Sequence, residues 1–381
     1  MTKTVTDRRE LGDPGRARRV VVKIGSSSLT DAAGRLDVHK LTALVEVLAG
    51  RRAAGGQVVL VSSGAIASAL GVLGLSGRPR DLATAQAAAS VGQGLLMAHY
   101  TRAFGAHGLT VGQVLLTVED VVRRAHHRNV QRNVERLLAL GVVPVINEND
   151  AVATQEIKFG DNDRLAALVS HLSKADALVL LTDVDALYDR SPRLPGARRI
   201  ARVRDRRDLE GIEVTARGGA VGTGGMVSKL ESAAIASGAG IPVVVTAAHN
   251  AGAVLSGEDV GTWFEPARRR TNARRLWLAH AAHTGGSISV DEGAVQAITA
   301  GKKSLLAAGV VDVTGEFDAG DPIDVLDPAG RVVARGLASY SAEELPARLG
   351  RTSVQMREQF GPDSARAVVH RDDLVVLDRT D

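Results

Sequence analysis

Two lysines lie in glycine- and serine-rich segments of a chain that otherwise uses arginine for its positive charge. The sequence of 381 residues contains 39 arginines and only 8 lysines. Lys23 is followed by an isoleucine, a glycine and three serines, and Lys229 comes after five glycines within Gly218–Gly225. An ammonium is a compact point charge, and backbone amides of glycine-rich turns can approach phosphate oxygens closely. The two segments therefore predict phosphate binding, while a serine-rich turn and a surface loop are the structural alternatives.

Carboxylates and carboxamides gather in a second pair of segments. The apolar run Val142–Ile146 leads into Asn147-Glu148-Asn149-Asp150, and Asp161-Asn162-Asp163 follows soon afterwards. We expect this second cluster to cap a helix that runs from Leu165. Side chains of these types, at a strand end and at a helix start, can hold the ammonium of an amino acid or a magnesium ion. Two separate Asx-rich turns are the alternative.

Hydroxyl groups follow two further apolar runs. Ser62-Ser63-Gly64 comes after Gln57–Val61, and a helix of small residues begins at once, so its free amides could bind an anion. Ordinary capping of the helix by serine explains the same pattern. Thr182-Asp183 comes after Leu178–Leu181 and suits hydrogen bonds to the base or ribose of a nucleotide.

Apolar runs alternate with longer segments rich in alanine and leucine over the first 250 residues. We predict strands at Val20–Ile24, Gln57–Val61, Gly112–Leu116, Val142–Ile146, Leu178–Leu181 and Pro242–Val245. Helix-length segments include Val38–Ala54, Leu82–His107 and Val121–Leu140. Continuous apolar strands separated by helices are typical of a mostly parallel sheet covered on both faces. Ligands of such sheets bind beyond the carboxyl ends of the strands, which is where the polar clusters fall.

The pattern changes after residue 265. Pro266–Arg275 is polar and basic, and the apolar runs that follow are short and separated by turn pairs such as Asp321-Pro322. We predict strands at Ser287–Val290, Gly309–Val313, Pro322–Asp327, Val332–Ala334, Ala367–His370 and Leu374–Leu377. The sequence thus predicts a mobile tail over residues 1–17, an α/β domain (an αβα sandwich) over 18–265, a linker over 266–286 and a small, mostly β domain over 287–375.

Composition excludes several kinds of protein and of catalytic site. The chain has no cysteine, which excludes disulfides and thiolate chemistry. No apolar run reaches the roughly 18 residues of a membrane span, and we expect no secretory signal. The P-loop, GxGxxG, GxSxG and HExxH patterns are absent, and the ten histidines are scattered, so no resident metal site is expected. The net charge of +4 is nearly balanced, and we expect a cytoplasmic protein with no membrane contact.

Taken in order along the chain, the polar motifs resemble those of the amino acid kinase family. They read V-K-I-G-S-S, V-S-S-G-A-I, I-N-E-N-D-A-V-A-T, G-D-N-D, L-L-T-D and G-T-G-G-M-x-x-K. Within that family their order is most similar to the glutamate 5-kinases, and residues 287–375 resemble the PUA domain that the longer members carry. The resemblance covers nearly the whole chain, and Ile146–Thr154 and Gly222–Lys229 are its most specific parts. It implies phosphorylation of the glutamate side-chain carboxylate by ATP, with magnesium carried on the ATP.

The same resemblance implies a role for each motif residue. Lys23 and Lys229 would contact the ATP phosphates and the transferring phosphoryl group, and Asp163 would orient both lysines. The residues implied to bind glutamate are Ser63, Asp150 and Asn162. The residues implied to bind the nucleotide, besides Lys23, are Thr182, Asp183, Thr223, Gly224, Gly225, Met226, Val227, Ser228 and Lys229.

Three other functions compete with this one. A relative on the same fold could phosphorylate another carboxylate, carbamate, a nucleoside monophosphate or a phosphonate. A PUA domain could bind RNA, but acidic residues interleave with the basic ones in the C-terminal segment, and aromatic residues make up 3% of the chain, which argues against it. A non-catalytic sensor of glutamate or proline would not need Lys23, Asp163 and Lys229. The resemblance also implies feedback inhibition by proline. We expect a homo-oligomer, and, because an acyl phosphate is labile, hand-over of the product to glutamate-5-semialdehyde dehydrogenase.

Overall fold

The chain forms two compact units, Met1–Ala273 and Arg274–Asp381. The structure is a computed structural model that describes residues 4–117, 120–121, 124–152, 162–192, 194–209, 225–267, 273–280 and 284–377. The division between the units falls inside the segment 266–286, for which the sequence predicts a linker.

A sheet with the strand order β3-β4-β2-β1-β5-β7-β8-β6 forms the middle of the first unit. Its strands are β1 (Arg19–Ile24), β2 (Gln57–Ser62), β3 (Val111–Leu116), β4 (Val143–Glu148), β5 (Ala177–Thr182), β6 (Arg202–Val203), β7 (Val243–Ala247) and β8 (Thr262–Phe264). Every neighbouring pair is parallel except β7 and β8. The six strands predicted from the apolar runs are therefore confirmed, with bounds that shift by one or two residues.

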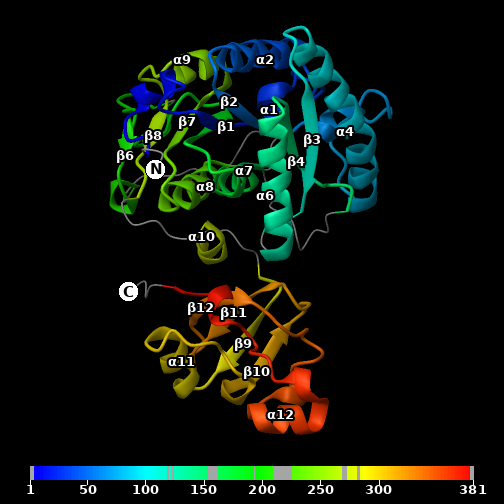
Figure 1. Ribbon diagram of the computed structural model, residues 1–381, viewed down its shortest axis with the longest axis vertical. Coiled ribbons are helices and arrows are strands. Elements are labelled where there is room, and N and C mark those ends of the chain that lie inside the picture. Colours follow the sequence, from blue (N-terminus) through cyan, green and yellow to red (C-terminus); the bar gives the residue numbers. More distant parts are fainter. Residues whose placement is uncertain are drawn as a thin grey trace. The chain divides into compact units, whose positions relative to one another are not determined.

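Helices cover both faces of this sheet, as the prediction of an αβα sandwich requires. They are α1 (Ser26–Leu29), α2 (Val38–Ala53), α3 (Ala65–Ala69), α4 (Leu82–Gly105), α6 (Arg124–Ala139), α7 (Asn162–Leu172), α8 (Met226–Gly238) and α9 (Ala251–Leu255). Figure 1 shows α2 and α9 over one face of the sheet and α7 and α8 over the other.

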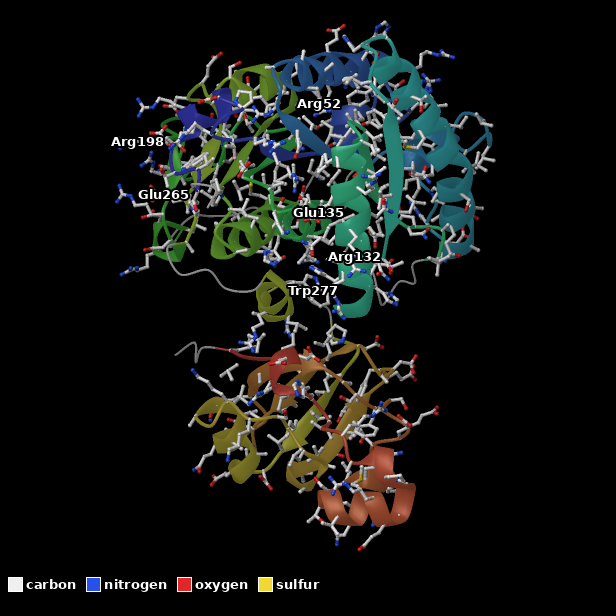
Figure 2. The ribbon with its side chains drawn as sticks, viewed as in Figure 1. Arg52, Arg132, Glu135, Arg198, Glu265 and Trp277 are labelled. Carbon is white, nitrogen blue, oxygen red and sulfur yellow. The ribbon has the colours of Figure 1, made fainter. Side chains whose placement is uncertain are left out.

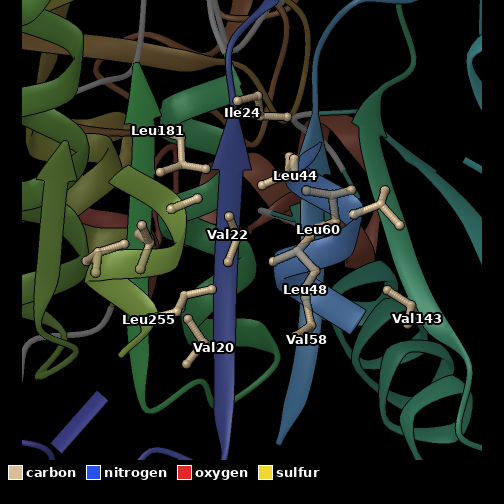
Figure 3. Close-up of a cluster of buried hydrophobic side chains, with 14 of the residues drawn as sticks. Val20, Val22, Ile24, Leu44, Leu48, Val58, Leu60, Val143, Leu181 and Leu255 are labelled. Atoms are coloured by element: carbon tan, nitrogen blue, oxygen red, sulfur yellow. The ribbon is translucent and has the colours of Figure 1, made fainter. Parts of the chain in front are cut away.

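Successive side chains of β1 point to opposite faces of the sheet. Val20, Val22 and Ile24 are buried against apolar side chains of α2 and α9, among them Leu44, Leu48 and Leu255 (Figure 3). Because successive residues of a strand point to opposite faces, Lys23 points to the face that α7 and α8 cover. The apolar core on one side of β1 thus fixes which way this lysine points.

Residues 4–17 correct the prediction of a mobile tail over residues 1–17, of which residues 1–3 lie outside the described part of the chain. A 3-10 helix, η1, spans Arg8–Gly12, and Val5 and Leu11 are fully buried in the core beside α2 and α9. The buried guanidinium of Arg51 on α2 donates to the carbonyl oxygens of Leu11, at 2.6 Å, and of Ala17. This segment is polar on average, so the sequence predicts no packing for it, but its few apolar residues attach it to the domain.

Hydrogen bonds from side chains join neighbouring elements at the surface of the first unit. Arg52, at the end of α2, donates to the carbonyl oxygens of Gly56 at 2.8 Å and of Gly141 at 3.0 Å. Glu135 on α6 accepts a hydrogen bond from Lys174, just beyond α7, at 2.9 Å. Figure 2 labels Arg52 and Glu135 on their helices.

The second unit contains a smaller sheet with the order β10-β9-β11-β12-β13. Its elements are α10 (Ala273–His280), β9 (Gly286–Val290), α11 (Glu292–Thr299), β10 (Val310–Gly315), β11 (Pro322–Leu326), β12 (Val332–Leu337), α12 (Ser353–Phe360) and β13 (Leu374–Val376). The strand predicted at Ala367–His370 is wrong. The carbonyl of Val368 accepts from the amide of Ser339, and Val369 forms an isolated bridge with Leu305. Among the described residues this segment therefore makes isolated bonds instead of a ladder.

No helix in the described part of either unit is long and apolar enough to cross a membrane.

Candidate active site

The polar clusters predicted from the sequence meet at one edge of the large sheet. In the parallel register, Ile24 pairs with Ser62 and Leu181, and Val61 pairs with Ile146. The residues that end β1, β2, β4 and β5 therefore lie side by side at the carboxyl edge, where sheets of this kind bind ligands. The first turns of α7 and α8 reach the same place.

Lys23, Asp163 and Lys229 form a buried Lys-Asp-Lys cluster at this edge. The Asp163 carboxylate has no solvent exposure. Lys23 Nζ lies 2.5 Å from Asp163 Oδ1, and Lys229 Nζ lies 3.2 Å from Asp163 Oδ2. Both lysine side chains are buried, with exposed fractions of 5% and 8%. One carboxylate between two ammoniums leaves the cluster with one net positive charge at the carboxyl edge of the sheet.

The electrostatics of Asp163 follow from two opposing effects. Burial favours the neutral acid and by itself raises the pKa of this carboxyl group. The charges of Lys23 and Lys229, together with their hydrogen bonds, outweigh that effect, and the pKa of Asp163 is lowered from its ordinary value. Asp163 is therefore ionised at neutral pH and holds both ammoniums in place.

The two helices that carry the cluster begin at the site itself. The sequence predicts that Asp161-Asn162-Asp163 precedes the helix, but α7 already begins at Asn162, so Asp163 lies in its first turn. A carboxylate in that position also interacts favourably with the positive end of the helix dipole. In α8, which begins at Met226, Lys229 is one turn inside, and helical side chains lean towards the N-terminus. Lys229 therefore reaches back to Asp163.

A second cluster beside the first consists of amide and hydroxyl groups. Asn162 Nδ2 donates to Ser63 Oγ at 2.8 Å and to Asn147 Oδ1 at 2.8 Å. Asn162 and Asn147 are buried, and Ser63 is half-buried. The motif resemblance implies glutamate binding by Ser63 and Asn162 but assigns no role to Asn147. Its position as the first polar residue after the apolar core of β4 was the signal that could have identified it.

The remaining predicted residues occupy the same edge. Asp150 is half-buried in the turn after β4. At the end of β5, buried Thr182 donates through Oγ1 to Asp183 Oδ1 at 2.9 Å, and Asp183 itself is exposed. Gly225 is the N-cap of α8, and Met226, Val227 and Ser228 are the first residues of the helix. Thr223 and Gly224 lie outside the described residues.

Comparisons with known sequences match both units of the chain to known families. Residues 18–247 match the model of the amino acid kinase family, and residues 286–360 match that of the PUA domain. Glutamate 5-kinase of Streptomyces coelicolor is 57% identical over 364 residues, covering 95% of this chain and 97% of the relative. Glutamate 5-kinase of Salinispora arenicola is 58% identical over 362 residues, covering 95% and 98%.

A solved structure supports the fold. The carbamate kinase from Giardia lamblia bound to AMP-PNP aligns with a TM-score of 0.50 at 16% identity, covering 66% of this chain and 99% of that one. The family model matches more than half of the chain, and the curated relatives match nearly all of it. The chain therefore belongs to the amino acid kinase family and to its glutamate 5-kinase branch, whose members transfer a phosphoryl group from ATP to the side-chain carboxylate of L-glutamate in the first step of proline biosynthesis.

Proposed function

We propose that this chain performs the reaction of its branch with the Lys-Asp-Lys cluster as its phosphoryl-transfer centre. The observation that carries the proposal is the burial of Asp163 between Lys23 and Lys229. The two ammoniums bind the phosphates of Mg·ATP and stabilise the charge on the transferring group. Asp163 acts through the lysines and is a positioning residue.

The chemistry of the acceptor explains why placed positive charge is what the site needs. A glutamate side chain has an ordinary pKa of about 4.3, so the nucleophilic carboxylate is ionised at neutral pH and requires no general base. The obstacle is repulsion, because two like unit charges at about 4 Å repel by about 4 kcal/mol at an effective dielectric constant near 20. Two fixed ammoniums and the magnesium ion of the substrate offset that repulsion as the bond to phosphorus forms.

We assign substrate binding to the cluster of amide and hydroxyl groups and to the turn after β4. We assign the ammonium and carboxylate groups of glutamate to Ser63, Asp150 and Asn162, which lie beside the Lys-Asp-Lys cluster at the same edge. We assign binding of the nucleotide to Thr182, Asp183 and the segment Thr223–Lys229. Asn147 fixes Asn162 through their 2.8 Å hydrogen bond and is added to the site as a positioning residue.

The product of the reaction is an acyl phosphate, which water readily hydrolyses. Direct hand-over to glutamate-5-semialdehyde dehydrogenase therefore stays a prediction that rests on the chemistry of this product. Proline inhibition at a site that overlaps the glutamate site, assembly into a homo-oligomer and a cytoplasmic location stay predictions as well.

A trapping experiment tests the proposal. The purified chain is incubated with magnesium, ATP, hydroxylamine and one acceptor at a time: glutamate, aspartate, N-acetylglutamate, carbamate or UMP. Hydroxylamine converts acyl phosphates into coloured hydroxamates, and release of ADP is followed in parallel. We expect hydroxamate with glutamate and little with the other acceptors. Faster ADP release with another acceptor would overturn the glutamate pocket of Ser63, Asp150 and Asn162.

A further inference from the structure

A chain of buried carboxamides leads from helix α4 to the glutamate site. Gln93, 8% exposed on α4, accepts a hydrogen bond at Oε1 from Asn147 Nδ2 at 2.9 Å. Asn147 Oδ1 in turn accepts from Asn162 Nδ2 at 2.8 Å. At the outer end, Gln93 Nε2 donates to Gln113 Oε1 on the edge strand β3 at 3.2 Å. Residues from two strands and two helices are joined in one line of donors and acceptors.

The donors and acceptors in this line fix the orientation of each amide. Asn147 Oδ1 accepts both from Asn162 and from the amide of Glu148, at 2.9 Å, so its Nδ2 must face Gln93. Asn162 uses its Nδ2 for Asn147 and Ser63, which turns its Oδ1 to the other side. That oxygen is buried and has no hydrogen-bond partner among the residues that the structure describes.

An unpartnered buried acceptor is costly unless a ligand supplies the donor. The ammonium of an amino acid is such a donor, with three protons and a positive charge. The orientation of Asn162 is therefore what makes it an acceptor for this group. If the amide turned over, it would present N–H groups to a cation and repel it.

We propose that Gln93 is a positioning residue for glutamate binding, which holds Asn147, and through it Asn162, with the Asn162 carbonyl oxygen towards the substrate ammonium. The proposal rests on the assignment of glutamate to Asn162 above. Gln93 has no hydrogen bond to Asn162 among the described contacts, and it acts through Asn147. Gln113 holds the far side of the Gln93 amide and is the outer end of the line.

Two substitutions of Gln93 separate this role from packing. Gln93→Met keeps the length of the side chain but removes the acceptor for Asn147. Gln93→Glu keeps an acceptor at the same place and introduces an acidic group into a buried position. We expect Gln93→Met to raise the KM for glutamate about tenfold, with the KM for ATP within about twofold of wild type. Gln93→Glu should keep the KM for glutamate within about threefold of wild type. A side chain that only fills space would give the reverse order.

Further variants make every outcome decisive. Gln113→Leu removes the outer acceptor at an exposed position, so it leaves the core intact, and it should raise the KM for glutamate about two- to threefold. Gln131→Met on α6, whose amide contacts Glu135 instead of the site, is the matched control and should leave both KM values unchanged.

A wild-type KM for glutamate in Gln93→Met, or an equal rise in both KM values, would overturn the role of Gln93. Asn162→Ala tests the underlying assignment separately, since an unchanged KM for glutamate there would overturn the proposed glutamate pocket itself.

Discussion

Arg164 on α7 and Glu231 on α8 form an ion pair that joins the two helices of the Lys-Asp-Lys cluster. Arg164 Nη2 and Nε lie 2.6 and 3.2 Å from Glu231 Oε2. Arg164 directly follows Asp163, and Glu231 comes two residues after Lys229. The pair thus holds the Asp163 carboxylate and the Lys229 ammonium of the cluster at a fixed separation.

We expect the substitutions Arg164→Met and Glu231→Gln to raise the KM for ATP severalfold, because each loosens the contact that sets Lys229 against Asp163. A double-mutant cycle on kcat/KM for ATP should show a coupling energy of about 0.5–3 kcal/mol, as for other residues in direct contact. Steady-state kinetics of the two single variants and the double variant measure it. Effects that simply add, to within about 0.5 kcal/mol, would show that the pair does not act as a unit.

The lysines of the cluster should not tolerate replacement. Lys23→Ala and Lys229→Ala each remove one preorganised positive charge and should lower kcat by roughly a hundredfold or more. Lys229→Arg should be nearly as damaging, since a planar, forked guanidinium does not replace a point charge between a buried carboxylate and a phosphate. Turnover is measured by ADP release with saturating glutamate.

The exposed Lys303 of the second unit supplies the matched control for these changes. Lys303→Ala and Lys303→Arg should leave kcat unchanged. Full activity in the folded Lys229→Arg variant would contradict the argument from the scarcity of lysine in this chain.

Asp163→Asn should reduce the stability of the first unit as well as activity. It leaves two buried ammoniums without their counter-charge, and breaking a buried ion pair from one side costs about 3–5 kcal/mol. Urea unfolding reports this loss, with fluorescence of the buried Trp263 read in a Trp277→Phe background so that a single tryptophan remains.

The dependence of this loss on pH has a definite sign. The pKa of Asp163 is lower in the folded chain than its ordinary value, so the ionised carboxylate contributes fully above the unfolded pKa of about 3.9. Its contribution is lost as the pH falls from there through the folded pKa. The difference in unfolding free energy between wild type and Asp163→Asn should therefore be constant from pH 7 to about pH 5 and shrink below about pH 4. A difference that grows on acidification would contradict the lowered pKa.

Much of this architecture could be predicted from the sequence, because strands and their polar ends are encoded by residues that are neighbours in the chain. A buried parallel strand such as Val20–Ile24 is a continuous apolar run, and the polar residue that ends it must lie at the carboxyl edge of the sheet. The sequence therefore predicts that Lys23, Ser63 and Thr182, at the ends of three such strands, lie at one edge of the sheet.

The remainder depends on contacts that no local pattern records. Gln93 lies within a long helix of small residues, and nothing near it in the sequence indicates that its amide meets Asn147, 54 residues away. Val5 and Leu11 lie in a segment that is polar on average, yet both are buried by helices from later in the chain. The tertiary fold determines which group a buried polar side chain contacts and where an isolated apolar residue packs.

Gly92, next to Gln93 on α4, shows how closely this helix must approach α3. A Cβ atom on Gly92 would lie 1.8 Å from the carbonyl oxygen of Ala65 on α3, the helix that follows Ser63. Gly94, two residues further on, is exposed and has no atom within 4 Å of such a Cβ. The two glycines therefore provide a matched pair on one helix.

Gly92→Ala should force α4 away from α3 and lower the unfolding free energy by about 1–3 kcal/mol or more. Because Gln93 moves with α4, the KM for glutamate should rise in the same variant. Gly94→Ala should instead stabilise the helix by about 0.5–1 kcal/mol, since alanine restricts the unfolded chain more than glycine does, and it should leave the KM unchanged. Urea unfolding and glutamate saturation curves of both variants check this. A Gly92→Ala variant as stable and active as Gly94→Ala would show that α4 does not depend on this close approach.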